Sequence, residues 1–416
     1  MNILFMSLLD FDDIQEHNIY TDLLREFCKS GHSICCISPI ERKKKQKTKL
    51  IQCGTNVKIL KLQIGNVQKT NFVEKGISTL AIEPQFIYGI KKYFSDEKFD
   101  MVLYTTPPIT LLRAVNYVKR RDKAFAYLML KDIFPQNAVD IGMLSKTGVK
   151  GVLYWYFRNK EKKLYRGSDY IGCMSQANVN YVKVNNSEIE ESKIGLCPNC
   201  IEPMMQYEVS KKDCLQIRRK FGIPQNSIVL VYGGNLGRPQ GITFMIDCIK
   251  SAIQIPEVFF LIIGSGTEYS FIEKKMQKEG IHNAKLIQYM PKEEYDNLLR
   301  TCDIGLIFLD YRFKIPNFPS RLLGYLDAGL PILAATDLCT DVGMTIVDGK
   351  FGWWCESRSI EDYIEVLERI VAEQKKDKHY LKKKGKVARE YLEQYYDVKM
   401  EYKSIISQYE KHKASS

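Results

Sequence analysis

The stretch from residue 314 to residue 337 contains the residues best suited to bind an anion. Ser320 is a candidate N-cap at the expected start of a short helix, which Gly329 and Pro331 end. The start of a helix exposes unpaired backbone N–H groups and about half a positive charge, which suits a phosphate oxygen. Arg321 would add a guanidinium in the first turn. A cation there is repelled by the helix dipole unless an anion is present, so its position favours an anion-binding role. The alternative is an arginine that lies on the surface without a ligand.

Two glycine-containing turns in the same half of the chain predict further phosphate contacts. A strand expected at residues 228–232 runs into residues 233–238, GGNLGR, and a strand expected at residues 258–263 runs into Gly-Ser-Gly. Because glycine has no side chain, its backbone N–H can approach an oxygen closely. Arg238 strengthens the first of these signals. A tight turn that binds nothing is the alternative for each.

Polar residues follow two strands that are expected in the first half. Thr106 ends the strand at residues 100–106, and Asp132 follows the strand at residues 125–130. In open parallel sheets ligands gather beyond the carboxyl ends of the strands, which puts both residues in the crevice. Asp132 is therefore a candidate acid or base. A structural aspartate that caps the next segment is the alternative.

The signals for metal or redox chemistry are weak. Residues 10–13, DFDD, have the Asp-x-Asp spacing that some sugar-transfer enzymes use for a metal, but a solvated or helix-capping role is favoured. Cys197 and Cys200 have the spacing of a zinc or redox pair, yet no second pair follows them. The 12 cysteines are expected to be reduced, small hydrophobic residues. No metal is expected.

The order of the expected elements predicts two α/β domains. Strands such as residues 2–9 and 33–38 flank a helix at residues 20–31, which indicates a parallel sheet of the doubly wound type. A chain of 416 residues is too long for one ordinary core. No run of about 18 apolar residues exists and the N-terminus soon becomes acidic, so neither a membrane span nor a signal peptide is expected. We therefore expect a cytoplasmic protein.

The net charge of +12 predicts a polyanionic partner. No recognised reader motif for nucleic acid is present, so nucleic acid is the weakest choice. Residues 42–49, RKKKQKTK, form a basic run, and residues 149–166 combine aromatic and basic residues on one expected helix. Such a helix is typical of a membrane interface, which favours an anionic membrane surface as a partner. A solvated loop, and aromatic residues that pack beneath the domain, are the alternatives.

The order of these motifs resembles the GT-B fold of family 4 glycosyltransferases over essentially the whole chain. The matching pieces are Lys29-Ser30-Gly31-His32, Pro198-Asn199, residues 233–241, Gly264-x-Gly266, Pro291 and Ala328-Gly329-Leu330-Pro331. The segments KDIFPQNAVDIGML and FPSRLLGYLDAGLPILAATD look like the branch that assembles capsule, exopolysaccharide or O-antigen repeat units.

The resemblance implies two Rossmann-like domains with a cleft between them. Residues 1–205 are expected to hold the acceptor and residues 206–395 the nucleotide sugar, while the helix at residues 396–416 packs back toward the first domain. The donor diphosphate is expected to contact Gly234, Asn235, Leu236, Gly237, Arg238, Ser320 and Arg321. The donor sugar or nucleoside is expected near Gly264, Gly266, Tyr289, Asn317 and Pro319. The acceptor is expected near Thr106, Lys131 and Asp132, and the catalytic residues are expected to be Arg238, Arg321 and Asp132.

The sequence departs from the family at its hallmark carboxylates. Counted back from Gly329-Leu330-Pro331, the positions of the two family glutamates hold Pro316 and Gly324. Further family positions hold Asn235 in place of arginine, Gln240 in place of lysine and Lys131 in place of histidine. Arg238 and Arg321 are expected to replace the lost positive charge around the phosphates.

The resemblance implies a hexosyltransferase that retains anomeric configuration and needs no metal. Its donor would be a nucleotide sugar, with UDP as the default, and its acceptor a lipid-diphosphate-linked or saccharide chain. The expected setting is bacterial surface polysaccharide synthesis at the inner face of the plasma membrane. A catalytically silent partner subunit is the alternative that the missing glutamates favour. A nucleotide-sugar epimerase shares the two-domain design but lacks a clear acid-base carboxylate set here.

Overall fold

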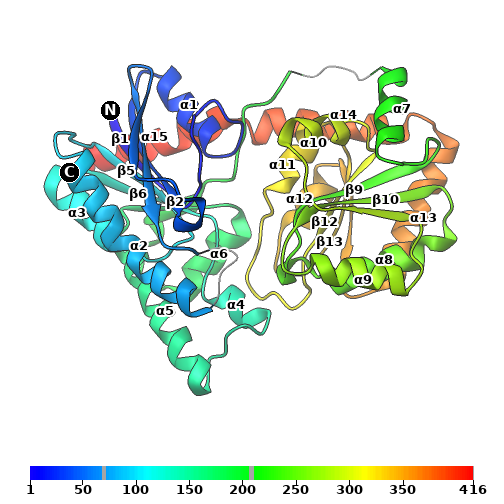
Figure 1. The fold of residues 1–416 in the computed structure, drawn as a ribbon, viewed down its shortest axis with the longest axis horizontal. Helices are drawn as coiled ribbons and strands as arrows, with labels where there is room; N and C mark the ends of the chain where they lie inside the picture. The colour runs from blue at the N-terminus through cyan, green and yellow to red at the C-terminus, as the bar shows by residue number, and fades with distance from the viewer. Residues whose placement is uncertain (68–71, 206–209, 416) are drawn as a thin grey trace. The chain divides into compact units, whose positions relative to one another are not determined.

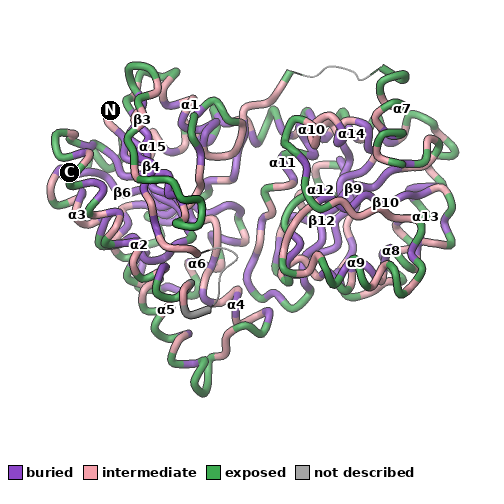
Figure 2. Tube along the Cα trace, in the orientation of Figure 1, coloured by how far each residue is buried: buried purple, intermediate pink, exposed green. Residues whose placement is uncertain are grey.

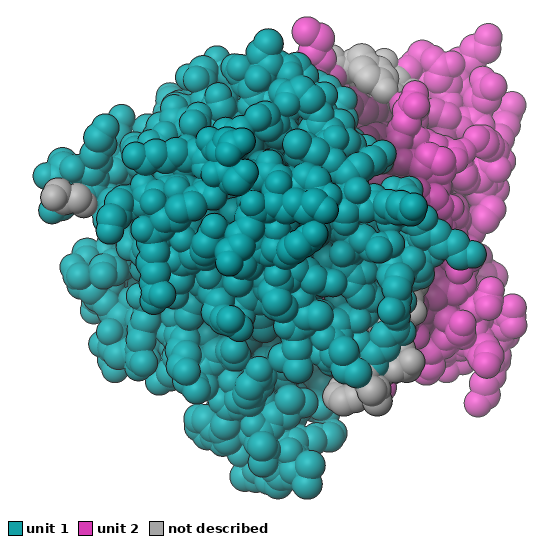
Figure 3. Space-filling model, turned by 60° about the vertical axis from the view of Figure 1, so that its left-hand side comes forward, with its two compact units in different colours: residues 1–202, 397–416 teal, residues 203–396 magenta. Residues whose placement is uncertain are grey.

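The computed structural model describes residues 1–67, 72–205 and 210–415, which form two compact units (Figure 1). Unit 1 consists of Met1–Glu202 together with Asp397–Ser416, and unit 2 is Pro203–Tyr396 (Figure 3). Each unit has its own sheet and its own buried strands (Figure 2). Each is therefore described by itself.

Unit 1 contains an eight-stranded sheet in the order β3-β4-β2-β1-β5-β6-β7-β8. Neighbouring strands are parallel, except that β3 and β4 form an antiparallel hairpin at the edge. The strands are β1 Asn2–Met6, β2 Ser33–Glu41, β3 Lys49–Cys53, β4 Val57–Ile64, β5 Met101–Thr105, β6 Phe125–Leu130, β7 Tyr170–Cys173 and β8 Ile194–Leu196. The strand order reverses direction between β1 and β5, which is where open sheets of this type form a crevice.

The helices of unit 1 connect successive strands, as a doubly wound sheet requires. They are α1 Thr21–Lys29, α2 Phe72–Tyr93, α3 Leu112–Asp122, α4 Gln136–Asp140, α5 Gly148–Gly167 and α6 Gln176–Asn185. The last helix of the chain, α15 Val398–Ser415, packs against α1 and β6. Tyr402 of α15 meets the ring of Phe27 at 5.1 Å, and its hydroxyl lies 3.1 Å from Nε2 of His32. The C-terminal helix is thus part of the core of unit 1.

Unit 2 contains a six-stranded parallel sheet in the order β11-β10-β9-β12-β13-β14. The strands are β9 Ile228–Asn235, β10 Val258–Ser265, β11 Ala284–Ile287, β12 Ile304–Phe308, β13 Ile332–Thr336 and β14 Gly352–Glu356. The helices are α7 Lys211–Lys220, α8 Ile242–Ser251, α9 Tyr269–Lys278, α10 Lys292–Leu299, α11 Arg321–Asp327, α12 Val342–Asp348, α13 Ile360–Lys376 and α14 Tyr380–Tyr395. The strand order reverses between β9 and β12, so the crevice of this sheet is expected beside the end of β9.

The doubly wound architecture predicted from the sequence is confirmed, with corrections to individual strands. No strand was identified from the sequence at β8, which follows β7 and pairs with it. The hairpin of β3 and β4 lies partly in the expected basic loop, because residues after Lys44 continue into an exposed edge strand. The first glycine turn begins inside β9, whose last residues Gly233, Gly234 and Asn235 pair with β10.

Candidate functional site in the C-terminal unit and its acceptor-side counterpart

The ends of β9 and β10 form two glycine-containing turns that pack directly against each other. Gly234, with φ of +119°, lies opposite Gly264 in the sheet, and a Cβ on Gly264 would lie 1.9 Å from the Gly234 carbonyl oxygen. A Cβ on Gly266 would lie 2.1 Å from the carbonyl oxygen of Leu236. The Leu236 N–H also donates to the Ser265 carbonyl at 3.0 Å. Close packing between the turns therefore explains Gly264 and Gly266, and it fixes the backbone of the first turn.

Arg321, the first residue of α11, lies against the first turn. Its guanidinium carbon is 4.2 Å from the centroid of the Tyr232 ring, and a Cβ on Gly234 would lie 3.8 Å from its Nη2. Among the described residues, no carboxylate forms an ion pair with Arg321, and its buried Nη1 has no hydrogen-bond partner. Buried cations are normally paired, so this arginine has unused capacity to bind an anion.

Two tyrosines hold the end of β9 in place next to this arginine. The Tyr232 hydroxyl donates to the Asn235 carbonyl at 2.8 Å. The Gly233 N–H donates to the Tyr325 hydroxyl at 3.0 Å, and that hydroxyl donates to the Leu306 carbonyl at 3.1 Å. Burial raises the pKa of both tyrosines, so both stay neutral and give Arg321 no formal counter-charge. The sequence offered one signal for Tyr325: it lies four residues after Arg321 and so shares its helix face.

Arg238 differs from Arg321 in its surroundings. It begins a short 3-10 helix, Arg238–Gln240, and its side chain is 63% exposed, with Nε 3.7 Å from Oε1 of Glu268. The Gly237 N–H before it donates to Oε1 of Gln240 at 3.0 Å, which closes the turn. Gln240 therefore has a structural role at the position where the family carries a lysine. Arg238 is a flexible cation at the rim of the turn, whereas Arg321 is fixed beneath it.

The start of α11 is a weaker anion site than its sequence predicts. Ser320 occupies the N-cap position, but its backbone is helical (φ −63°, ψ −17°) and its side chain accepts no bond from the first turn. The capping bond needs an extended backbone at that residue. The helix has only seven residues, so its dipole is short. The anion-binding capacity here rests on the Arg321 side chain.

The remaining residues predicted on the donor side lie on loops of unit 2. Tyr289, after β11, is 78% exposed. The backbone N–H of Asn317 donates to Oγ1 of Thr340 at 3.0 Å, and its buried Nδ2 has no partner among the described residues. The Pro319 carbonyl accepts from the Leu322 N–H at 3.2 Å. A Cβ on Gly324 would meet no atom within 4 Å, so space for a side chain remains where the family has a glutamate.

In unit 1, Asp132 follows β6 at the carboxyl end of the sheet. Both of its carboxylate oxygens accept from Nδ2 of Asn137, at 2.8 and 2.9 Å, and no cation pairs with it among the described residues. Burial raises the pKa of Asp132 to about 6. Thr106 shapes the turn: its Oγ1 accepts from the Lys131 N–H at 3.0 Å. Asn137 was not predicted, although it lies only five residues after Asp132 in the sequence.

Lys131 has a different role from the one that the resemblance implied. Its Nζ lies 3.4 Å from Oε1 of Glu401 on α15, and both side chains are buried. The Cys197 thiol donates to the same oxygen at 3.6 Å. Burial raises the pKa of Glu401 to about 7. The Lys131 ammonium is thus occupied by an internal ion pair that holds the C-terminal helix, and only Thr106 and Asp132 remain at the strand ends.

The other two chemical motifs also have structural roles. Asp10 and Asp12, from the DFDD segment, are counter-ions of the buried Lys61. Cys197 and Cys200 are buried, and burial raises the pKa of both thiols. Within the part of the chain that the structure describes, no three His, Cys, Asp or Glu residues form a group able to hold a metal ion.

The aromatic and basic residues of α5 lie partly on the surface. Trp155 is 59% exposed and Tyr156 41%, while Tyr154 is buried and Phe157 packs on the ring of Phe134 at 5.0 Å. In the basic run, Arg42 pairs with Glu74 at 2.9 Å. None of the described helices is long and apolar enough to cross a membrane.

Known proteins that are similar to this chain are glycosyltransferases. Residues 214–387 match the family model of the glycosyl transferases group 1. A probable glycosyltransferase of Pseudomonas aeruginosa, WbjE, is 23% identical over 297 residues, which cover 69% of each chain. A putative colanic acid biosynthesis glycosyl transferase of Escherichia coli K12, WcaI, is 22% identical over 304 residues, covering 72% of this chain and 71% of that one.

Solved structures resemble the whole chain at low sequence identity. Sucrose-phosphate synthase from Thermosynechococcus elongatus superposes with a TM-score of 0.78 at 15% identity and covers 100% of both chains. The Anabaena protein Alr3699/HepE, solved in complex with UDP and glucose, gives a TM-score of 0.69 at 13% identity and covers 98% of both chains. At these identities the likeness establishes the fold, which is shared over the full length.

Proposed function

We propose, from the premise that the chain has the GT-B fold and is a glycosyltransferase of group 1, that it transfers a hexose from UDP to a lipid-linked or saccharide acceptor. The observation that carries the donor assignment is Arg321, a half-buried guanidinium whose buried Nη1 has no partner among the described residues and which lies beside the glycine turn of β9. A planar guanidinium matches the oxygens of a phosphate, and the adjacent backbone N–H groups add donors. The UDP bound to the similar HepE structure supports the choice of nucleotide.

In the proposed reaction, the bond between the sugar C1 and the diphosphate oxygen breaks, and its electron pair stays on the leaving diphosphate. Arg321 and the N–H groups of residues 234–237 would stabilise the negative charge that grows there. Arg238, at the rim, would add a second, mobile positive charge. Since these groups neutralise the diphosphate, we expect transfer to continue in EDTA.

The acceptor hydroxyl oxygen would form the new bond to C1 on the face that the diphosphate leaves, which retains the anomeric configuration. Its proton would pass to the leaving diphosphate. We propose that Asp132 orients this hydroxyl by accepting a hydrogen bond, because Asn137 fixes both of its oxygens and no cation competes for them. The relative WcaI, which is named for colanic acid biosynthesis, supports a saccharide acceptor.

We propose that the protein acts at an anionic membrane surface on the cytoplasmic side. Trp155 and Tyr156 are exposed on α5, and Lys150 and Lys163 of the same helix are exposed too, which is the composition of an interfacial helix. A lipid-linked acceptor would be presented at such a surface.

Ligand binding by the full chain tests the donor assignment. In a thermal-shift and calorimetry panel of nucleoside diphosphates, a ligand at 100 times its dissociation constant adds about 2.7 kcal/mol of stability. We expect UDP to stabilise the wild type and not Arg321→Met. Pro316 and Gly324, in place of two family glutamates, favour a silent partner subunit as the second candidate. If no nucleoside diphosphate binds, the silent subunit is correct and the enzyme assignment is wrong.

A further inference from the structure

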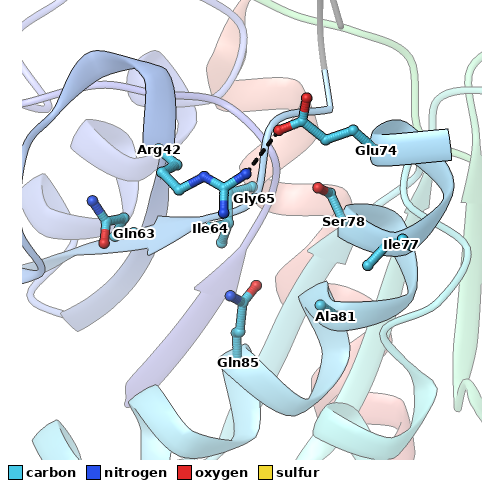
Figure 4. Close-up of a pocket in the computed structure, with 9 residues that line it drawn as sticks. All are labelled: Arg42, Gln63, Ile64, Gly65, Glu74, Ile77, Ser78, Ala81 and Gln85. Atoms are coloured by element: carbon cyan, nitrogen blue, oxygen red, sulfur yellow. Dashed lines mark hydrogen bonds and ion pairs between the residues drawn. The ribbon is translucent and has the colours of Figure 1, made fainter. Parts of the chain in front are cut away.

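Unit 1 contains a second cavity that the proposed reaction does not use (Figure 4). It has a volume of about 610 Å³ and lies between the end of β4 and the first turns of α2. Volumes of about 300 to 1,000 Å³ are typical of small-molecule sites. Gly65 permits the close approach of β4 to α2, because a Cβ there would lie 2.3 Å from Oγ of Ser78.

The lining of this cavity contains both polar and apolar groups. Gln85 and Ser78 contribute an amide and a hydroxyl, while Ile64 and Ala81 contribute aliphatic carbon. At the rim, Arg42 donates to Glu74 at 2.9 Å, so the charges of these two residues offset each other. A site with no excess charge, and with both polar groups and aliphatic carbon in its lining, suits a neutral sugar ring, whose C–H face packs on aliphatic carbon.

One atom of the cavity lacks a partner that a ligand would supply. The amide oxygen Oε1 of Gln85 is buried and accepts no hydrogen bond from any described residue. Figure 4 shows the Gln85 amide directed from α2 toward the cavity. A buried acceptor without a donor is unfavourable, and a ligand hydroxyl would satisfy it. A hydrocarbon chain would leave this oxygen unpaired, which favours a saccharide over a lipid tail.

The position of the cavity indicates which part of an acceptor it would hold. It follows β4, whereas Asp132 follows β6, and the strand order between them is β4-β2-β1-β5-β6. Four strand spacings of about 4.8 Å separate the two points by roughly 19 Å along the carboxyl edge of one sheet. A single ring cannot reach both. The cavity would therefore bind a ring that is distant from the reacting hydroxyl.

We infer that the cavity between β4 and α2 is a distal subsite for a neutral pyranose ring of the acceptor saccharide, with Gln85 accepting a hydrogen bond from a ring hydroxyl. This inference rests on the proposed function for the identity of the ligand as an acceptor. It makes unit 1 selective for acceptors of several sugar rings.

Saturation-transfer NMR on the full chain with methyl pyranosides of glucose, galactose, mannose and N-acetylglucosamine tests this subsite. We expect at least one of them to bind the wild type, Gln85→Met to weaken it about tenfold, and Ala81→Phe to abolish binding by filling the cavity. The matched controls are Gln52→Met, an exposed glutamine on β3, and Leu80→Phe, an exposed residue next to Ala81 on α2. Both controls should bind like the wild type.

The inferred subsite is wrong if no pyranoside binds, or if the wild type and the four variants bind the pyranosides equally. It is also wrong if dodecanol binds in an Ala81-dependent way while the pyranosides do not, because the cavity then holds a lipid chain. UDP calorimetry on the same proteins separates this outcome from the donor assignment. If the wild type does not bind UDP but the pyranosides bind in the expected pattern, the proposed donor is wrong and the inferred subsite is still supported.

Discussion

Two cations, Lys131 of unit 1 and Arg321 of unit 2, differ in whether a carboxylate pairs with them, although unit 2 also contains the buried, ion-paired Arg218 and Arg389. In unit 1, Lys131 is buried against the carboxylate of Glu401, and Lys61 is buried against Asp10 and Asp12. In unit 2, Arg321 stacks on Tyr232 and pairs with no carboxylate among the described residues. A buried ion without a partner is costly, so proteins retain one mainly where a ligand supplies the opposite charge. We therefore assign a stabilising role to the ion pair of Lys131 and Glu401 and a functional role to Arg321.

The sharpest test of this contrast is the stability of unit 1. Lys131→Met leaves Glu401 buried without its cation, and removing one partner of a buried pair costs about 3 to 5 kcal/mol of unfolding free energy. Urea unfolding measures the loss, and hydrogen exchange in α15 assigns it to unit 1. The double variant Lys131→Met with Glu401→Leu should recover most of the loss.

The matching change in unit 2 should not destabilise the protein. Arg321→Met replaces a cation without a counter-ion by an apolar side chain that can still pack on Tyr232. A loss of unfolding free energy as large as that of Lys131→Met would mean that Arg321 is a structural cation, and the comparison would fail.

Activity should show the reverse order. Removing a preorganised donor from a developing charge costs about 3 to 4 kcal/mol, so Arg321→Met should lower the transfer rate by about 10² to 10³. Arg238 was expected from the sequence to be catalytic as well, but that side chain is 63% exposed and is not fixed beneath the turn. We expect Arg238→Ala to lower the rate by about tenfold or less. Steady-state kinetics with a nucleotide sugar measures both, and near wild-type rates for Arg321→Met would remove its catalytic role.

The sequence was sufficient for the architecture because local patterns determine it. Apolar runs such as residues 125–130 are strands in the structure with the same bounds, and the glycine turns lie at the ends of β9 and β10. Elements without a strong period were harder to predict. The exposed edge strand β3 has a mixed burial pattern, and β8 has only three residues. Neither produces a periodic signal long enough to recognise.

The partners of the site residues could not be predicted in the same way. Glu401 lies 270 residues from Lys131, and only the packing of α15 against β6 brings them together. Sequence spacing indicates neighbours three or four residues apart on a helix, as for Arg321 and Tyr325, but not contacts made by the fold. The resemblance therefore placed Lys131 at the acceptor, whereas tertiary structure assigns its ammonium to α15.

Asp132 extends the comparison to an anion. Among the described residues no cation pairs with it, although the buried cations Lys131 and Lys61 of the same unit both have carboxylate partners. Burial raises its pKa to about 6, so it loses its proton as the pH rises through that value. If the carboxylate orients the acceptor, kcat/KM should rise with pH up to about 6 and then level off. Asp132→Asn should remove this limb and lower the rate by about 10².

The pH dependence of the unfolding free energy provides a control for this test of Asp132. Its folded pKa lies above the ordinary value of 3.8, so the folded state binds the proton more tightly than the unfolded state. The carboxyl therefore lowers the unfolding free energy as the pH rises from about 4 to about 6. Asp132→Asn should be at least as stable as the wild type at pH 7, and a destabilised variant with an unchanged pH profile would indicate a purely structural aspartate.

We expect the smallest effect from changes to surface lysines. Water screens their charge, so they contribute to binding only at a polyanionic surface. Lys150 and Lys163 are exposed on α5, the helix that also exposes Trp155 and Tyr156. Each lysine near an anionic membrane contributes about 1 kcal/mol, so the double change to glutamine should weaken binding to phosphatidylserine vesicles about 30-fold at low salt. Vesicle sedimentation measures this. Lys212→Gln with Lys274→Gln, exposed lysines of unit 2, changes the net charge equally and should have little effect. Equal weakening by both pairs would show that net charge alone drives the binding, and α5 would then have no special role at the membrane.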